Sequence, residues 1–103
     1  MSGFVLHPGA RLDLSEIFDF VTGDNPAAAL TVLDGIERSI ELLASNPLMG
    51  HPRPELGAHR IRFHAVGNFL IAYAPHHSPL LVLAVVHGKR NPRTIASILR
   101  SRA

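Results

Sequence analysis

The feature that most constrains the fold is an uninterrupted aliphatic run from Leu80 to Val86. Neither face of a strand with this sequence can remain in water, so the strand belongs in the interior of a sheet. A second apolar run of strand length, residues 69–75, precedes it after a short segment with two histidines and a proline. We therefore expect two adjacent antiparallel strands, around which the rest of the chain packs.

The length and composition indicate one soluble domain that spans residues 1–103. A chain with 47% hydrophobic and 17% charged residues has the composition of a folded protein and not of a disordered one. It contains no cysteine, which excludes disulfide bonds and thiolate metal sites. No apolar stretch reaches the roughly 18 residues of a membrane span, and the N-terminal residues lack the pattern of a signal peptide. We expect a cytoplasmic protein without membrane association.

Charge is distributed unevenly along the chain. Residues 1–56 hold all eight acidic residues and three arginines, a net charge of −5. Residues 57–103 hold seven basic residues and no acidic ones, a net charge of +7. This polarity favours a surface whose positive side contacts an anionic partner, either a nucleic acid or an acidic protein. The alternative is that each half is simply solvated.

Apolar periodicity and capping signals predict one strand and two helices in the first half. Residues 4–6 are apolar and precede His7-Pro8, which indicates a first strand of about five residues. Apolar residues at helical spacing then predict a helix at 9–22. A second helix begins at Asn25-Pro26, where a capping residue precedes a proline, and stops at residues 45–47. The connection is so short that the two helices must lie side by side and cover the sheet.

The second half predicts three strands and a short final helix, so the expected order is β-α-α-β-β-β-α. This is an α+β fold in which a helical hairpin packs on a small, mostly antiparallel sheet. Residues 46–58 contain three prolines and two glycines and are interpreted as an irregular loop. Gly67-Asn68 predicts a two-residue turn between strands, and Asn91-Pro92 predicts the start of the last helix.

Polar and apolar residues alternate strictly in residues 60–65, which indicates a strand with one basic and one buried face. The basic face holds Arg60, Arg62 and His64, and the buried face holds Ile61, Phe63 and Ala65. The basic residues of this strand and of the C-terminal segment make a candidate anion-binding group: Arg60, Arg62, His64, His87, Lys89, Arg90 and Arg93. If they share a face, that face binds phosphate or carboxylate groups. With a histidine as general base and arginines that stabilise the phosphorane, such a face would cleave RNA through the 2′-hydroxyl. Without a correctly placed acid and base it would only bind.

The histidines do not form a recognisable metal site. No two of them have the four-residue spacing of a helical site. The seven are His7, His51, His59, His64, His76, His77 and His87. The chain also lacks a glycine-rich phosphate loop and a nucleophile motif. We expect neither a metal nor a cofactor.

The role of His87 stays open at this point. By strand parity it shares a face with Leu81, Leu83 and Val85, which are all apolar. It is therefore interpreted either as a catalytic base or as the half-buried last residue of the strand.

Six short segments carry a family resemblance through their order and spacing. They are residues 8–17 in the first helix, 25–29 at the start of the second, 46–50 after it, and then 60–62, 69–73 and 85–90. Together they resemble the ParE branch of the ParE/RelE superfamily, the toxins of bacterial toxin–antitoxin pairs. The resemblance covers nearly the whole chain and implies the same α+β fold.

Function divides within this superfamily. RelE-like members are ribosome-dependent ribonucleases, whereas ParE-like members inhibit DNA gyrase and have no catalytic site of their own. The ribonucleases commonly carry an arginine after the aromatic residue of the third-strand motif, where this chain has Leu70 after Phe69. They also tend to have a tyrosine at the position where Gly88 follows His87 here. The resemblance therefore implies a protein without catalytic residues.

The resemblance implies a type II toxin that inhibits DNA gyrase and is neutralised by a cognate ParD-like antitoxin in a heterodimer or larger hetero-oligomer. The candidate target-binding residues are Lys89, Arg90 and Arg93. The candidate antitoxin-binding residues are Arg60, Arg62, Phe18 and Leu33. Two alternatives remain: a ribosome-dependent mRNA endoribonuclease that uses His87 with Arg60 or Arg62, and a non-toxic ParE-like binding module.

Overall fold

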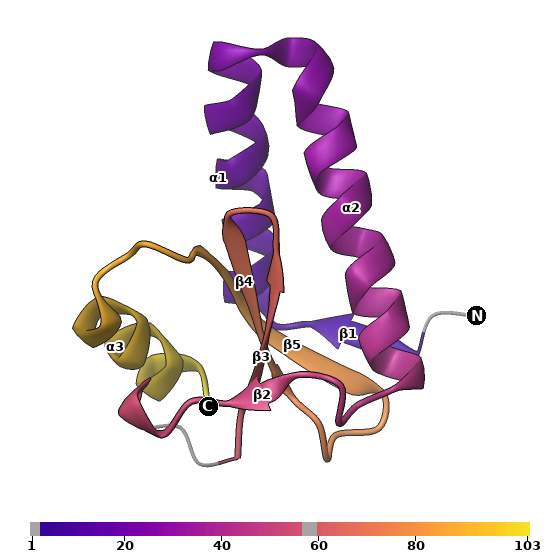
Figure 1. Cartoon of the computed structure of the whole chain (residues 1–103), viewed down its shortest axis with the longest axis vertical. Coiled ribbons are helices and arrows are strands. Elements are labelled where there is room, and N and C mark those ends of the chain that lie inside the picture. Colours follow the sequence, from indigo (N-terminus) through magenta and orange to yellow (C-terminus); the bar gives the residue numbers. More distant parts are fainter. Residues whose placement is uncertain (1–2, 57–59) are drawn as a thin grey trace.

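The computed structural model describes residues 3–56 and 60–103 and confirms the α+β fold (Figure 1). Its elements are β1 (Phe4–Leu6), α1 (Pro8–Asp24), α2 (Pro26–Ser45), β2 (His51–Pro52), the 3-10 helix η1 (Pro54–Leu56), β3 (Arg62–Val66), β4 (Phe69–Ala74), β5 (Leu80–His87) and α3 (Pro92–Arg102). Each α-helix begins with a proline that follows a capping side chain, from His7, Asn25 and Asn91. His59 lies outside the described residues.

The five strands form one mixed sheet in the order β1-β5-β4-β3-β2. β1 pairs with β5 in parallel, and the other neighbouring pairs are antiparallel. β5 lies between β1 and β4, and six of its eight residues are buried, as its aliphatic sequence requires. The predicted turn at Gly67-Asn68 joins β3 to β4, with Gly67 at a φ of 56°. β1 is shorter than expected, with three residues, because His7-Pro8 leads directly into α1.

α1 and α2 form the expected hairpin and lie side by side (Figure 1). Asn25 caps α2, since its Oδ1 accepts a hydrogen bond from Ala28 N at 3.3 Å. The predicted end of the first helix at residue 22 is wrong, because α1 continues to Asp24. Gly23 is exposed and a side chain there would meet open space, so the helix passes through it at a cost of only about 1 kcal/mol.

The loop predicted for residues 46–58 contains two short elements, β2 and η1. β2 pairs antiparallel with β3, with His51 opposite Phe63 and Pro52 opposite Arg62. A proline is compatible with a strand here because β2 lies at the edge of the sheet, where the missing N–H breaks no ladder. The prediction of an irregular loop is therefore corrected over residues 46–56, and residues 57–58 lie outside the described part.

The alternation predicted for residues 60–65 is only partly correct. β3 begins at Arg62. Ile61 and Phe63 are buried as expected, but Ala65 is exposed. The prediction for Ala65 is wrong: this residue is exposed near the turn between β3 and β4, although its partner in β4, Leu70, is buried.

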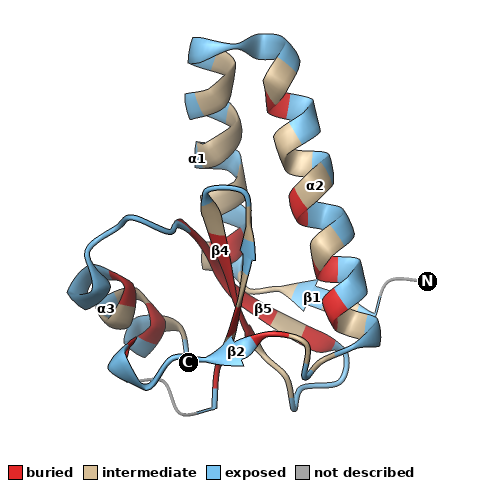
Figure 2. Ribbon diagram, viewed as in Figure 1, coloured by how far each residue is buried: buried red, intermediate tan, exposed pale blue. Residues whose placement is uncertain are grey.

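Both faces of the sheet are covered, so the core has two parts (Figure 2). α1 and α2 cover one face, where the buried residues include Ile36, Ile40, Leu43, Ile71, Tyr73 and Val82. α3 and η1 cover the other face, where they include Leu56, Phe63, Leu70, Leu83, Ile95 and Leu99. Successive residues of β4 alternate between these two parts, as the pleat of a strand requires. This two-sided cover explains why β5 is aliphatic on both faces.

A β-bulge in β5 changes which of its residues share a face. Tyr73 pairs with Val82, but the preceding residue of β4, Ala72, pairs with Ala84, so Leu83 is an extra residue without a partner in β4. Leu83 and Ala84 consequently both belong to the core beneath α3. The alternation of the strand is thus inverted after this point.

The bulge overturns the parity expected for His87. Beyond it, Val85 packs into the core on the hairpin side, whereas Leu81 and Leu83 pack on the α3 side. His87 therefore shares a face with Val85 but not with Leu81 and Leu83. The interpretation of His87 as a half-buried residue is also wrong, because it is exposed at the end of β5.

An ion pair links α1 to α3 around the edge of β5. Arg102 donates two hydrogen bonds to the Asp13 carboxylate, at 2.6 and 3.1 Å, and the two side chains are only 15% and 12% exposed. Both also bind β5 beyond the residues that β1 pairs: Val85 N donates to Asp13 at 3.0 Å, and Arg102 donates to Leu83 O at 3.1 Å. A side chain at Gly9 would collide with the Arg102 guanidinium. We call this arrangement the Asp13–Arg102 clamp.

Tyr73 anchors the connection between α2 and β2. It is fully buried, and its hydroxyl donates to Pro47 O at 2.7 Å and accepts from Gly50 N at 2.8 Å. A Cβ at Gly50 would lie 2.5 Å from the Tyr73 oxygen and 2.8 Å from Phe63 O, so only glycine fits there. Burial raises the pKa of Tyr73, while the Gly50 hydrogen bond and the charge of Arg62 oppose the rise.

Removing the arginine of the clamp should destabilise the fold. We expect Arg102→Ala to lower the free energy of unfolding by about 2–3 kcal/mol, because it leaves a largely buried carboxylate and a strand carbonyl without their charged donor. Denaturant unfolding measures the change. Arg100→Ala is the matched control, since Arg100 is exposed on the same helix, and it should change stability by no more than about 0.5 kcal/mol. Equal effects of the two variants would contradict the role of the clamp.

The raised pKa of Tyr73 makes the fold sensitive to alkaline pH. Below the ordinary value of 10.0, folded and unfolded states both keep the proton, and the stabilising contribution is complete. Above it the unfolded state ionises first, so the free energy of unfolding should fall with rising pH. In Tyr73→Phe this fall should be shallower. Urea unfolding at a series of pH values around 10 measures both proteins, and identical pH profiles would disprove the prediction.

Candidate functional site

The oppositely charged halves of the sequence occupy different layers of the fold. α1 and α2 carry seven of the eight acidic residues and cover one face of the sheet. α3 and the connection that precedes it carry five of the ten basic residues, and α3 covers the other face. The sheet therefore separates an acidic layer from a basic one, as the charge distribution predicts.

Three exposed cations form the most concentrated basic surface, and we call Lys89, Arg90 and Arg93 the basic cluster. The backbone beneath them is held by short-range hydrogen bonds: Arg90 N donates to His87 O at 3.0 Å, and Arg93 N donates to Asn91 Oδ1 at 2.8 Å. Within the described residues the clamp is the one ion pair. No carboxylate of this part of the chain forms an ion pair with the basic cluster, although Asp13 and Glu16 line the same pocket as Arg90.

His87 lies beside the basic cluster, and its ring has defined neighbours. Its Nδ1 accepts a hydrogen bond from Lys89 N at 3.1 Å. The ring packs edge-on against Phe69, with centroids 5.7 Å apart and an interplanar angle of 72°. In this geometry the neutral imidazole carries its proton on Nε2, which leaves that nitrogen as a donor.

The structure does not bring His87 together with the arginines proposed to assist it. Arg62 pairs with Tyr73, which pairs with Val82, so Arg62 lies two strands away from β5 and level with Val82. His87 is farther along β5, and strand dimensions place the two residues on the order of 15 Å apart. Arg60 lies before β3 and lines a groove with Leu81, Leu83 and Arg102, which His87 does not line. A general base and a charge-stabilising group must both reach one reacting phosphate, and these residues do not.

Arg62 and Leu70, two positions that the ribonuclease alternative involves, both have structural roles in this fold. The Arg62 guanidinium donates to Gly50 O at 2.7 Å and to Leu48 O at 3.2 Å, so it anchors the same connection as Tyr73. Leu70 is 5% exposed and belongs to the core beneath α3. An arginine at this position would bury an unpaired charge. The basic residues expected on one catalytic face are thus distributed over separate parts of the fold.

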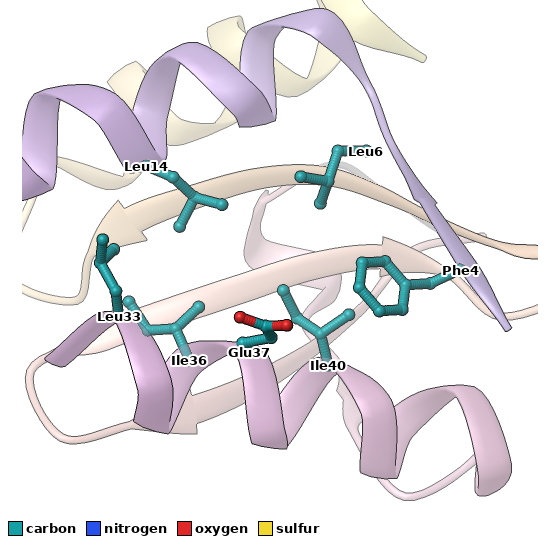
Figure 3. Close-up of a pocket in the computed structure, with 7 residues that line it drawn as sticks. All are labelled: Phe4, Leu6, Leu14, Leu33, Ile36, Glu37 and Ile40. Atoms are coloured by element: carbon teal, nitrogen blue, oxygen red, sulfur yellow. The ribbon is translucent and has the colours of Figure 1, made fainter. Parts of the chain in front are cut away.

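An apolar groove runs between α1, α2 and β1 (Figure 3). Its volume is about 280 Å³, and it is lined by Phe4, Leu6, Leu14, Leu33, Ile36, Glu37 and Ile40. Leu6 and Leu14 face Ile36 and Ile40 across it, and Glu37 is its one acidic wall residue (Figure 3). The predicted antitoxin-binding residue Leu33 is among the residues that line it. We call this the hairpin groove.

The other candidate antitoxin-binding residues lie outside the hairpin groove. Phe18 is half-buried on α1 and does not line it. Arg60 is exposed and borders a second groove of about 530 Å³ together with His76 and His77. Arg62 is tied to the α2–β2 connection. The four predicted residues therefore do not form one continuous surface.

The described residues provide no metal site. Over residues 3–56 and 60–103, no group of three histidine or acidic side chains is placed to hold a metal ion. In the same part of the chain, no helix is both long and apolar enough to cross a membrane.

Comparison with known proteins agrees with this architecture. A family model described as "ParE toxin of type II toxin-antitoxin system, parDE" matches residues 4–92. The chain belongs to the ParE toxin family. It is therefore the toxin component of a type II toxin–antitoxin system, a family that implies an antitoxin partner. No curated protein matches the chain significantly.

The family match extends from β1 to the first residue of α3 in this ParE toxin. It includes the hairpin groove, Lys89 and Arg90, whereas Arg93 and the rest of α3 lie beyond it. The segments on which the sequence resemblance depends all fall inside the matched range.

Sequence reasoning missed the clamp. Arg102 is one of the seven basic residues counted in the second half of the sequence, but the structure binds it to Asp13, so it adds little to the basic surface. The local signal is weak: Gly9 and Asp13 are four residues apart and share one side of α1. Their partner lies 89 positions from Asp13, and no local pattern indicates it.

Proposed function

We propose that this ParE-family toxin inhibits DNA gyrase by binding it, without catalysis of its own, and that a cognate ParD-like antitoxin neutralises it in the cytoplasm. The observation that carries the proposal is the basic cluster: three exposed cations without carboxylate partners, on a fold in which His87 is remote from Arg60 and Arg62. Exposed unpaired charges accelerate and orient binding to an anionic surface. They do not by themselves catalyse a reaction.

The hairpin groove supports the antitoxin part of the proposal. It is lined mostly by aliphatic side chains, which accept the apolar face of a partner helix or strand. On α1, Phe20 is 80% exposed. A surface of this kind favours a heterodimer or larger hetero-oligomer with the antitoxin and low solubility of the isolated toxin.

The ribonuclease alternative has no supporting geometry in the described residues. Its proposed base and arginines lie at different ends of the sheet, and Leu70 is part of the core. His87→Ala provides its test: loss of ribosome-dependent mRNA cleavage in this variant, after cleavage by the wild type, would support the alternative. Expression without growth arrest would instead support a non-toxic binding module.

The basic cluster should be required for gyrase inhibition. We expect wild-type toxin, released from its antitoxin, to block supercoiling by purified gyrase and to accumulate linear DNA. The triple variant Lys89→Gln, Arg90→Gln, Arg93→Gln should need at least about tenfold more protein, because neutral side chains remove the attraction to an anionic surface. A gel-based supercoiling assay measures both. The fold should be unchanged, since exposed charges contribute little to stability.

The matched control for this experiment is Arg11→Gln, Arg38→Gln, Arg53→Gln. It removes the same charge from exposed positions in the acidic half of the chain. It should inhibit gyrase like the wild type. Equal loss in both triple variants would show a general charge effect, and no inhibition by folded wild-type toxin in clear molar excess would reject the gyrase proposal.

Leu33 should be required for antitoxin binding. We expect Leu33→Glu to weaken the affinity for the antitoxin at least about tenfold, because the new carboxylate would be desolvated in an apolar groove beside Glu37. Isothermal titration with purified antitoxin measures the affinity. Leu30→Glu is the control: Leu30 lies on the same helix, is 63% exposed and does not line the groove. Similar affinities of the two variants would place the antitoxin elsewhere.

A further inference from the structure

The outward face of α3 and the connection before it carry cationic and neutral polar side chains but no acidic ones. Ile95 and Leu99 are the buried residues on the inner side of α3. The exposed polar side chains on the rest of this surface are Lys89, Arg90, Asn91, Arg93, Thr94, Ser97, Arg100 and Ser101. Each of them has a hydrogen-bond donor, and none is acidic. We call this surface the donor face.

The donors are arranged along one side of the helix. Arg93, Ser97 and Arg100 follow each other at intervals of four and three residues, which places them on one face. Arg93 and Arg100 are separated by about 10 Å along the helix axis, at 1.5 Å per residue. A DNA strand advances about 3.4 Å along its axis for each phosphate. The two arginines therefore span about three phosphate groups.

The composition of the donor face suits contacts to phosphate groups as well as to an anionic protein surface. Protein interfaces have a core of apolar, often aromatic, side chains. The large exposed hydrophobic residues of the described chain all lie in the acidic half: Val5, Leu12, Phe20, Leu30, Leu42 and Leu48. None of them belongs to the donor face, although Phe20 of α1 lines the same pocket as Arg90 at its edge. Phosphate contacts need only cations and polar donors of the kind present here.

The same surface is poorly suited to single-stranded nucleic acid. Proteins bind unpaired bases by stacking them on aromatic side chains. No residue of the donor face is aromatic, and the rings of His87 and Phe69 lie at its edge in a pocket shared with Arg90. Contacts to the backbone of a duplex require no such ring.

We propose that the donor face binds the phosphate backbone of duplex DNA without reading its sequence. The choice of DNA rests on the proposed function, because a gyrase inhibitor meets its target in complex with duplex DNA. Arg93 and Arg100 have no carboxylate partner within the described residues, so they are available to displace counterions from phosphates. The toxin thereby contacts the DNA held by its target as well as the protein.

The test measures binding of a fluorescein-labelled DNA duplex to the full-length toxin by fluorescence anisotropy at several salt concentrations. Arg93→Gln, Arg100→Gln should weaken binding about tenfold or more. It should also make the dependence of log affinity on log salt shallower by about 2, because each arginine that is replaced no longer neutralises a phosphate. The control Arg38→Gln, Arg53→Gln has the same net charge and should keep the wild-type affinity and slope.

The folding of the variant is controlled separately. Arg93 lies in the first turn of α3, where the helix dipole disfavours a cation, so glutamine should not weaken the helix there. Circular dichroism checks this. If the double variant does not fold, Lys89→Gln, Arg90→Gln replaces it, because both residues lie outside the helix.

The outcomes separate this inference from the proposed function. Equal DNA binding by the two double variants would overturn the proposed DNA-binding role of the donor face, even if the wild type inhibits gyrase. An RNA duplex or a polyglutamate peptide that binds more tightly than the DNA duplex would overturn it as well. DNA binding that depends on Arg93 and Arg100, without inhibition of gyrase, would support the donor face and reject the proposed target.

Discussion

The rest of the structure depends on how β5 is enclosed. An aliphatic strand of eight residues needs cover on both faces, and its neighbour β1 pairs with only three of these residues. The Asp13–Arg102 clamp continues the cover along the edge that β1 leaves, and each side chain also binds a backbone group of β5. Because the pair is bidentate and largely removed from water, loss of one partner would leave a desolvated charge unpaired, which costs more than breaking an exposed ion pair. The pair connects the hairpin layer, the sheet and α3.

This enclosure also determines where the chain can make contacts. The sheet lies between the acidic hairpin and the basic helix α3, so the hairpin groove and the donor face belong to different layers. On the proposed function, the antitoxin and the target therefore bind mainly to different surfaces. To cover the target-binding surface directly, the antitoxin would then need a segment that extends from the hairpin groove around the sheet. The clamp offers a physical connection between the two sides, because α1 contributes Leu14 to the groove and Asp13 to the clamp.

Much of the fold follows from local sequence patterns, because they are strong here. The aliphatic run of β5, the caps at Asn25 and Asn91, and the turn at Gly67-Asn68 each identify their element. What the sequence does not reveal depends on contacts between distant segments. The bulge at Leu83 inverts strand parity, and parity arguments assume a regular ladder. The same holds for the candidate site. Lys89, Arg90 and Arg93 are exposed, as their basic character predicts. The anchoring of Arg62 could not be predicted, because it depends on backbone carbonyls of a distant loop.

The surroundings of Leu70, Arg62 and His87 fit the proposed function, in which the toxin acts by binding. Leu70 contributes to the core that holds α3 on the sheet, so an arginine there would weaken the helix that carries Arg93 and Arg100. Arg62 is bound to two carbonyl oxygens, and its release would disturb the connection that Tyr73 also anchors. A catalytic arrangement would therefore have to be built at the expense of the packing that presents the basic surface. A toxin that acts by binding needs only that surface, held firmly and kept free of carboxylates, and the clamp and the core beneath α3 provide this support.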